Sequence, residues 1–315
     1  MATYQTYTAI GMREDLSDVI YSISPTDVPF MSSIGKTKAT AVLHEWQTDS
    51  LAAASLTNYA VEGDTASDAT MSPTTRVGNR CQIAQKTIKI SGTLQAVDKA
   101  GRKSEKAYQL AKASSEIKRD MELTLLSNQV AAAGNSSTAR TLGGLQAWLS
   151  TSYSGGTSGV AGSLGTTART NGTNRTFTEA ILQASVKSVY TAGGNPKILM
   201  VTPAHKQTVS AFTGIAAQRY MAPTNAPTTI IGAADVYLSD FGTLSVVPSR
   251  FMNSTNSADD VAYLLDPDMA AVAYLRPFQT NELAVTGDNE STQLLAEFTL
   301  EVRNEAAHGI IADLT

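Results

Sequence analysis

The sequence contains a single cysteine, so no disulfide can form within the chain. This fits a reducing compartment, and we expect Cys81 to be a packed thiol because it lies in a stretch of alternating polar and apolar residues. Basic residues are not in excess, and the net charge of −4 gives no general attraction to nucleic acid or to an anionic membrane. No apolar run is long enough to span a membrane, and the N-terminus lacks the pattern of a secretory signal. We therefore expect no membrane partner.

Residues that bind metals or catalyse reactions are few and scattered. The three histidines, His44, His205 and His308, have no second ligand at metal-binding spacing, and one cysteine cannot build a structural zinc site. We expect these histidines to be structural, the first on a strand face, the second in the first turn of a helix and the third in a β segment. The sequence also has no Gly-x-Ser-x-Gly nucleophile elbow.

Two further motifs resemble binding sites only in part. Residues 35–37 read Gly-Lys-Thr, as at the end of a phosphate-binding loop, but Phe30 stands where that loop needs a glycine. Asp266 and Asp268 flank Pro267, which predicts a turn rather than a cation site. We expect no metal, no cofactor and no catalytic residue, although a Ser-His-Asp triad assembled from distant positions stays open.

The most regular stretch, residues 101–134, predicts one long helix. Its apolar residues recur at gaps of three or four and so share one narrow face: Ala107, Leu110, Ala113, Ile117, Met121 and Leu125. We expect Leu110, Ile117, Met121 and Leu125 to form its core contact. Gly134 is a plausible end, and the start could lie as early as Thr93 or Asp98. Both a spine laid across a sheet and an ordinary long helix fit this pattern.

Residues 1–40 predict an arm rather than a part of the core. A short amphipathic helix is expected over residues 14–21, after which Pro25 and Pro29 interrupt any helix. An extended segment with apolar residues must lie against something, and the rest of the sequence offers it no clear partner. We therefore expect Pro25, Pro29 and Phe30 to contact a neighbouring subunit.

Residues 41–92 predict a long β-hairpin that projects from the body. Residues 41–49 alternate as a strand, residues 60–75 are rich in Gly, Asp, Thr and Ser, and residues 77–90 return as a second strand. The apolar positions change parity along the return strand, which suggests a bulge near Gln85. Such an arm cannot bury itself, so we expect a partner subunit to hold it, with four polar contact residues: Glu62, Asp64, Arg76 and Arg80.

The remaining sequence, with the folded-protein composition of 42% hydrophobic and 17% charged residues, predicts about two domains. The glycines at 156–165 predict a flexible surface loop. Residues 177–250 predict a compact α/β module separate from the long helix. This module starts with a helix over residues 178–190, capped by Thr178, whose apolar face has four candidates: Ala180, Ile181, Ala184 and Val189. Strands follow in residues 259–315, and we expect them to pair with one another beside the long helix. The α/β module would then be an insertion within the domain that contains the helix.

Three strings of the sequence are similar to one branch of tailed-bacteriophage major capsid proteins. They are SPTDVPFMSSIGKTKATAVLHEWQTDSL (24–51), VDKAGRKSEKAYQLAKASSEIKRDMELTLLSNQ (97–129) and EVRNEAAHGIIADL (301–314). The resemblance implies the α+β shell fold that tailed phages share with herpesviruses and encapsulins. The implied parts are an N-terminal arm (1–40), a projecting hairpin (41–92), a peripheral domain with the spine helix (93–145 and 248–315) and an axial α/β domain (146–247).

The resemblance also implies a function in assembly. Copies of the chain would form hexamers and pentamers of an icosahedral shell around double-stranded DNA, first in the host cytoplasm and finally in the virion. Because few residues precede the arm, we expect the scaffold to be a separate protein; a portal and decoration proteins are further expected partners, and DNA would be contacted non-specifically. Some relatives crosslink a hairpin lysine to a neighbour, but residues 60–75 contain no lysine, so we expect no crosslink. The alternatives are an encapsulin-type compartment and a cytosolic α/β hydrolase-like enzyme with its site in residues 177–250.

Overall fold

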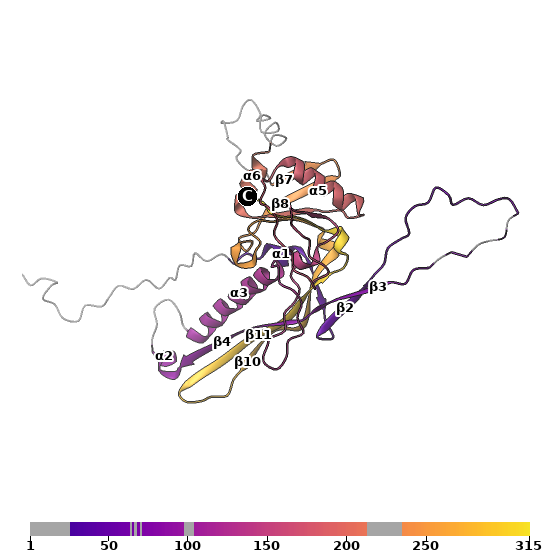
Figure 1. The fold of residues 1–315 in the computed structure, drawn as a ribbon. Helices are drawn as coiled ribbons and strands as arrows, with labels where there is room; N and C mark the ends of the chain where they lie inside the picture. The colour runs from indigo at the N-terminus through magenta and orange to yellow at the C-terminus, as the bar shows by residue number, and fades with distance from the viewer. Residues whose placement is uncertain (1–25, 64, 66–67, 70, 98–103, 213–234) are drawn as a thin grey trace, which may run out of the picture.

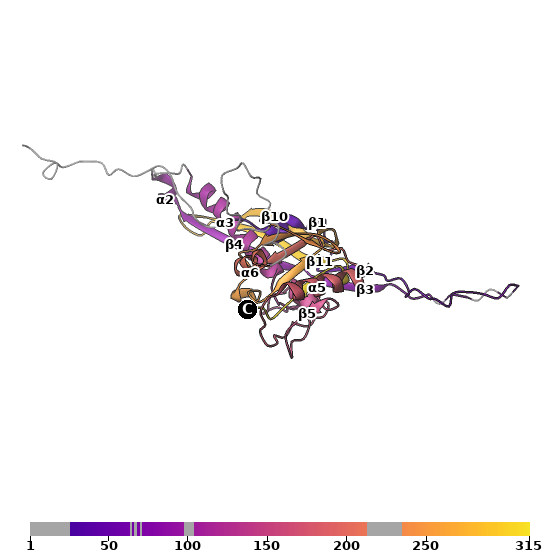
Figure 2. The same cartoon turned by 90° about the horizontal axis from the view of Figure 1, so that it is seen from above.

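The computed structural model of this protein describes residues 26–63, 65, 68–69, 71–97, 104–212 and 235–315. Figure 1 shows a central body from which a long hairpin projects to one side, while long strands and a helix form the other end. In the view turned by 90° in Figure 2, these two extensions again point in opposite directions. Our expectations for Pro25, Asp64 and residues 14–21 fall outside the described residues.

A four-stranded sheet forms the elongated end of the body, and its strands come from both ends of the sequence. In order across the sheet they are β1 (Gly35–Lys38), β10 (Ala270–Glu282), β11 (Asn289–Val302) and β4 (Gln82–Ser91). β1 pairs parallel with β10, and the other two pairings are antiparallel. Helix α3 (Glu105–Leu125) lies along β4 and β11, as expected for a spine laid across a sheet (Figure 1).

Helix α3 is shorter than the sequence predicts. It begins after Ser104, whose side-chain oxygen accepts a hydrogen bond from a backbone N–H three residues further on. It ends at Leu125, so the prediction of one helix reaching Gly134 is wrong. The chain turns away because Asn128 exchanges two hydrogen bonds, both 2.7 Å long, with the backbone of Arg169 in a distant loop. The 21 residues of the helix make a rod about 31 Å long.

One stripe of α3 packs into the main hydrophobic core. Four members of the predicted stripe are buried there: Ala113, Ile117, Met121 and Leu125. Leu110 is partly buried against the same core, whereas Ala107 is exposed. The stripe therefore narrows toward the N-terminal end of the helix, where the sheet beneath it also ends.

A six-stranded sheet forms the other half of the body. Its strands, in order, are β5 (Tyr153–Ser154), β12 (Gly309–Ile311), β9 (Ala262–Leu265), β6 (Ile198–Val201), β8 (Gly242–Pro248) and β7 (Val236–Ser239). Side chains alternate between its two faces, as strand geometry requires. Leu199 and Leu264 join the cluster under α5 (Glu179–Thr191) and α6 (Pro203–Ser210), while Met200 and Tyr263 join the core that contains the spine stripe.

This sheet corrects two expectations about domains. The α/β module is not separate from the spine, because one face of its sheet packs into the spine's own core. Nor is it a simple insertion between residues 146 and 247, because β9 and β12, which we assigned to the peripheral domain, are two of its strands. Both errors have one cause, since strand partners far apart in sequence leave no local signal.

Helix α5 begins where the sequence predicts, and two of the four predicted face residues are right: Val189 is buried and Ile181 is partly buried against the same cluster. Thr178 caps it by accepting a hydrogen bond from the backbone N–H of Ile181. Ala180 and Ala184 are exposed, and the buried residues are Leu182, Ser185, Val186 and Val189. The small alanines fit either face, so periodicity could not separate the two choices.

The predicted hairpin consists of β2 (Leu43–Thr48) and β3 (Thr75–Arg80), which form a two-stranded antiparallel sheet. The return strand does not continue into β4, because the chain leaves one sheet and enters the other at Cys81. The bulge expected near Gln85 is wrong, since β4 pairs with β11 in unbroken register from Gln82 to Ser91. Cys81 is buried, as predicted, and burial first, then the charge of Glu297, raises the pKa of its thiol to about 11.

The glycine-rich segment is not a flexible surface loop. Two pairs of backbone bridges, between Val160 and Thr170 and between Ser163 and Thr167, fold it onto itself. Gly165 has a φ of +73°, and a Cβ there would lie 2.7 Å from the indole nitrogen of Trp148. The glycines therefore allow close packing around a buried tryptophan.

Short helical turns complete the described chain. They are α1 (Pro29–Ser33), α2 (Gly92–Ala96), α4 (Leu145–Trp148), η2 (Ser254–Asn256), η3 (Pro267–Met269) and η4 (Glu305–Ala307). Asp266 caps η3, so this segment is the turn that the sequence predicts. Within the described ranges, no helix has the length and hydropathy needed to cross a membrane.

Candidate assembly site

The projecting hairpin has two parts with opposite character. We call strands β2 and β3 the hairpin root and residues 49–74 the hairpin tip. The described tip residues are extended and contain no helix or strand (Figure 2). Leu56 is 100% exposed and Met71 is 91% exposed, and three more apolar side chains of the tip are also exposed: Leu51, Tyr59 and Val61. Apolar side chains on an extended loop remain in water unless another surface covers them.

The hairpin root is fixed to the body by buried contacts. The ring of Trp46 stacks on that of Trp148, with centroids 5.4 Å apart and planes 26° from parallel. Asn79 is fully buried and bonds backbone groups of two other segments, accepting from Gly143 N–H at 2.8 Å and donating to the carbonyls of Gly143 and Leu300 at 3.0 and 2.9 Å. These contacts determine the direction in which the hairpin leaves the subunit.

A charged cluster beside the root joins β1, β2 and β11. Glu301 accepts a hydrogen bond from Thr37 at 2.6 Å and lies 3.2 Å from Nε2 of His44, and Arg303 also bonds it. Burial opposes the ionised form of Glu301, but these three hydrogen bonds outweigh burial, so its pKa lies below its usual range. The cluster therefore holds a charged carboxylate at the base of the hairpin.

The short helix α1, which precedes β1 and the hairpin, is tied to the spine helix. Glu122 of α3 accepts hydrogen bonds from the backbone N–H groups of Phe30 at 2.7 Å and Met31 at 2.9 Å, the first turn of α1. Pro29 opens this turn, where its missing N–H costs nothing. Burial raises the pKa of Glu122 to about 7, while the two backbone donors act against that rise.

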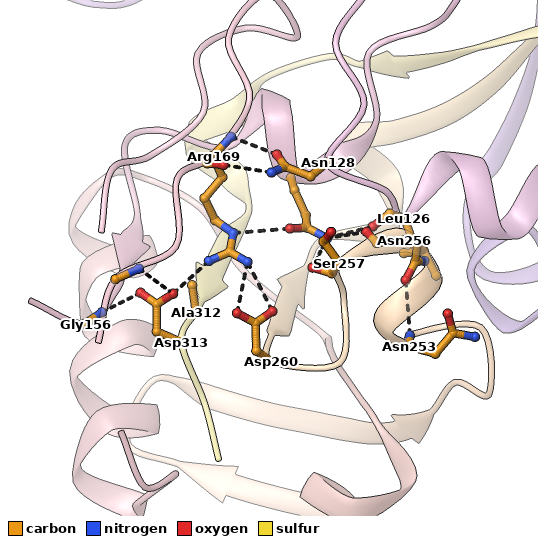
Figure 3. Close-up of polar contacts among 12 residues, drawn as sticks. Leu126, Asn128, Gly156, Arg169, Asn253, Asn256, Ser257, Asp260, Ala312 and Asp313 are labelled. Atoms are coloured by element: carbon orange, nitrogen blue, oxygen red, sulfur yellow. Dashed lines mark hydrogen bonds and ion pairs between the residues drawn. The ribbon is translucent and has the colours of Figure 1, made fainter. Parts of the chain in front are cut away.

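A buried polar network closes the body near the end of the sequence (Figure 3). The guanidinium of Arg169 is fully buried and donates to both oxygens of Asp260 at 3.1 Å, to Asp313 at 3.0 Å and to Gln146 at 3.2 Å. Asp313 also accepts from the backbone N–H groups of Gly156 and Gly172, at 2.7 and 2.9 Å. The network thus joins the glycine-rich segment to the end of the chain.

The described residues show no arrangement suited to metal binding, since no three His, Cys, Asp or Glu side chains gather there. His205 bonds the hydroxyl of Thr202 at 2.9 Å in the first turn of α6, and burial lowers its pKa. His308 is fully buried at the C-cap of η4, directly before β12, and burial lowers its pKa as well. With His44 on β2 beside Glu301, each histidine occupies a structural position of the kind that the sequence predicts.

The residues that we expected to contact a neighbour lie in different places. Phe30 is fully buried in its own subunit, so the expectation that its side chain meets a neighbour is wrong. Glu62 is exposed on the tip, Arg76 is exposed on β3 beside Glu45 at 3.2 Å, and Arg80 is half-buried at the end of β3. For these three, and for Pro29, a subunit contact stays a prediction.

Sequence reasoning missed the apolar residues of the tip. We selected charged residues there, because the loop composition drew attention to Gly, Asp, Thr and Ser. The usable signal was the presence of Leu51, Leu56, Tyr59 and Val61 in a segment with no strand or helix periodicity. Apolar residues with no element of their own to cover them indicate a partner surface.

The projecting hairpin, the spine helix across a four-stranded sheet and the six-stranded sheet with its helices form the fold of a phage-type shell subunit. Residues 1–315 match the family model described as SU10 major capsid protein, so the chain belongs to the SU10 major capsid protein family. The expectation of a tailed-phage major capsid protein with the shell fold is thereby confirmed, and the hydrolase alternative is not favoured.

Individual proteins agree with this assignment. The major capsid protein of Escherichia phage Phieco32 is 27% identical over 356 aligned residues, which cover 98% of this chain and 96% of that protein. The capsid subunit of Cyanophage A-1(L) has a TM-score of 0.69 at 13% identity, covering 96% of this chain and 97% of that one. The SrpI encapsulin of Synechococcus elongatus has a TM-score of 0.56 at 11% identity, covering 100% of this chain and 96% of that one. At these identities, the two structures show a shared fold alone.

Proposed function

We propose that copies of this chain assemble into hexamers and pentamers of an icosahedral shell that encloses double-stranded DNA. Membership in a major capsid protein family supports a shell function, and the exposed apolar tip is the observation that carries the assembly mechanism. The hairpin tip of one subunit lies across its neighbour and buries its apolar side chains there. The expectation that all of residues 1–40 form an arm outside the core is wrong, because α1 and β1 belong to the body of their own subunit and Phe30 is buried in its core. In the assembled shell, only residues 1–25 act as the arm that reaches a second neighbour.

The tip contains enough apolar surface to support such contacts. Fully burying a large apolar side chain contributes about 1.5–3 kcal/mol, and the tip offers five exposed ones. Much of this is offset by the entropy lost when an extended loop becomes ordered on a partner. Each contact is therefore weak by itself, and the shell gains stability from the repetition of that contact around closed rings.

We further propose how the two sheets are placed in a capsomer. The six-stranded sheet with α5 and α6 forms the axial part at the capsomer centre, and the four-stranded sheet with α3 forms the peripheral part. Among the described residues β7 is an edge strand, and its exposed Val236 and Leu238 support a contact of the axial part with another copy. The axial part proposed here includes β9 and β12, whereas the sequence suggested a single continuous domain, residues 146–247.

Other partners follow from the shell function. We propose a separate scaffold protein, a portal and decoration proteins, with assembly in the host cytoplasm and a final place in the virion. DNA is contacted non-specifically, since a net charge of −4 supports no general affinity for it. No covalent crosslink forms between subunits, because residues 49–74 contain no lysine and Lys86 of β4 is held by Glu116 of the spine at 2.8 Å. Denaturing electrophoresis of particles should give monomer bands, and a ladder of bands would refute this.

The test replaces three exposed side chains of the tip, Leu51, Leu56 and Met71, with serine. None of them is buried in the subunit, so circular dichroism and the thermal midpoint should match the parent protein. Shell yield, measured by sedimentation and electron microscopy, should fall to a small fraction of the parent yield. Val160→Ser, which removes an exposed apolar side chain from the glycine-rich segment, is the control and should leave the yield unchanged.

Parent-level yield of shells from the triple variant would show that the tip does not hold a neighbour. Particle contents separate the remaining alternative, because nuclease-resistant double-stranded DNA supports the capsid function and enclosed protein cargo supports a compartment. A small oligomer of defined size, with no larger particle under any condition, would contradict the shell function altogether.

A further inference from the structure

An apolar groove opens where α1, the spine helix and β10 meet. Its volume is about 790 Å³, and six of its lining residues are apolar or aromatic: Val28, Met31, Ile34, Tyr274, Pro277 and Phe278. Ser32, Lys36 and Lys118 form its polar rim. The groove begins two residues after the first described residue of the chain, Thr26.

The sheet edge beside the groove is not suited to another strand. β1 pairs with β10 only as far as Tyr274, and no other strand within the described ranges pairs with the following residues of β10 on that side. Pro277 cannot donate a backbone hydrogen bond, and the register of β10 shifts on both sides of Arg276. A strand added there would lose hydrogen bonds, so the groove favours an occupant that satisfies its own backbone, which is a helix.

The rim of the groove is positively charged and lacks counterions among the described residues. Lys36 and Lys118 have exposed side chains, and no described carboxylate lies within ion-pair distance of either. The Nζ atom of Lys118 lies 6.0 Å from the ring centroid of Phe278, at the border between the charged rim and the apolar floor. A matching occupant combines an apolar face with acidic residues beside it.

We propose that residues 14–21 of the same chain occupy this groove as an amphipathic helix. The segment reads Glu-Asp-Leu-Ser-Asp-Val-Ile-Tyr, and Leu16, Val19 and Ile20 fall on one helical face at i, i+3 and i+4. Asp15 lies beside that face and matches the lysines of the rim, whereas Glu14 and Asp18 fall on the opposite side of the helix and stay in solvent. The apolar face covers the groove and the carboxylate of Asp15 pairs with the rim.

The length of the chain favours docking on its own subunit. An eight-residue helix is about 12 Å long at roughly 1.5 Å per residue. The six residues between position 21 and Val28 span at most about 20 Å, enough for the chain to fold back over a groove that starts at Val28. Such a short tether gives residues 14–21 an effective concentration on the order of millimolar at the groove of their own subunit. The same segment of a neighbouring copy reaches such a concentration at this groove only after assembly. This inference concerns the isolated subunit and does not depend on the proposed shell.

Disulfide trapping tests the docking and identifies the chain that supplies the segment. Ser32→Cys places a thiol on the groove rim, and it is combined with Val19→Cys on the proposed docking face or, as the matched control, with Ser17→Cys off that face. The native Cys81 is buried and stays outside the reaction. In dilute subunit, the Val19 pair should form an intrachain disulfide at least tenfold faster than the Ser17 pair. Non-reducing electrophoresis and peptide mapping report which bond has formed.

A charge reversal provides a second measurement on the same pair of cysteines. Lys36→Glu with Lys118→Glu should slow trapping of the Val19 pair several-fold, and adding Asp15→Lys should restore part of the rate, whereas adding Asp18→Lys, on the opposite side of the helix, should not. Equal trapping of the Val19 and Ser17 pairs, or no trapping of either, would overturn the proposal. Bonds that form only between chains would overturn docking on the same subunit and assign the groove to a neighbour's segment.

Discussion

The hairpin root and the hairpin tip belong to one continuous segment, yet among the described residues only the root is held by buried contacts within its own subunit. The root is held inside the subunit by the stacked rings of Trp46 and Trp148 and by the buried amide of Asn79. The tip presents apolar side chains to water and has no regular element of its own. The subunit therefore fixes where the hairpin points, while in the proposed assembly a neighbour holds its far end. Changes in the body should therefore affect folding, and changes in the tip should affect assembly alone.

The largest effect on folding should come from Ile117→Asp. Ile117 is 1% exposed in the middle of the spine stripe, and an unpaired carboxylate there costs several kcal/mol or forces the helix off its sheet. A domain with a total of about 5–15 kcal/mol cannot easily absorb that cost. Soluble expression should be lost, whereas Lys118→Asp on the exposed neighbouring position should cost about 0.5 kcal/mol or less. Equal yields of soluble protein would mean that the stripe is not a core contact.

The next largest effect should come from Arg169→Met. The substitution leaves Asp260 and Asp313 without their buried partner, and removing one member of a buried ionic network typically costs about 3–5 kcal/mol. Urea unfolding of the subunit should show this loss. Arg250→Met, at an exposed position, is the matched control and should remain within about 0.5 kcal/mol of the parent. A small effect of Arg169→Met would show that the network contributes little to the body.

A pH-dependent effect is expected at Glu122, where α1 meets the spine. Its pKa in the folded protein is about 7, above the ordinary value of 4.5, so folding favours the protonated form. Its contribution to stability is thus complete below about pH 4.5 and is lost as the pH rises toward 7. Over that range the loss is on the order of 3 kcal/mol, at about 1.4 kcal/mol per pH unit.

Glu122→Gln removes this titration and should flatten the corresponding part of the stability curve. The histidines with lowered pKa values titrate in both proteins, so the difference between the two curves isolates Glu122. The measurement is urea unfolding at several pH values between 5 and 8. Parallel curves for the two proteins would contradict a raised pKa.

The smallest effect on folding should come from the tip. Leu56→Ser alters a side chain that is 100% exposed, so the free energy of unfolding of the subunit should change by less than about 0.5 kcal/mol. The same substitution should lower shell yield, because that side chain has no role inside the subunit. Thermal unfolding of the subunit and sedimentation of the assembly mixture measure the two effects. A loss of subunit stability would show that the tip packs on its own body.

Sequence patterns predicted a helix correctly where residues within or next to that helix determine its position. The middle of the spine helix followed from the spacing of Ile117 and Met121, and the start of α5 followed from the capping residue Thr178. The end of the spine helix could not be predicted, because it depends on hydrogen bonds between Asn128 and a segment about 40 residues away. The burial of Phe30 depends in the same way on the carboxylate of Glu122, 92 positions along the chain.

Sheet membership was the weakest part of the sequence interpretation. β9 and β12 read as strands, but nothing in their own residues indicates which sheet they join. The tight packing of the glycine-rich segment also depends on a distant partner, Trp148. For the assembly site, the resemblance to capsid proteins gave the projecting hairpin. The apolar tip residues were visible in the sequence but became meaningful only when the structure left them uncovered.

The passage of the chain from one sheet to the other at Cys81 gives the molecule a built-in reporter. The only thiol of the protein lies between β3 and β4, and its backbone N–H bonds the carbonyl of Val42 at 2.8 Å across the hairpin base. Burial and a pKa of about 11 make this thiol unreactive while the junction is closed. Its rate of alkylation therefore measures how often the hairpin base separates from the body, in a free subunit or within a finished particle, without any introduced label.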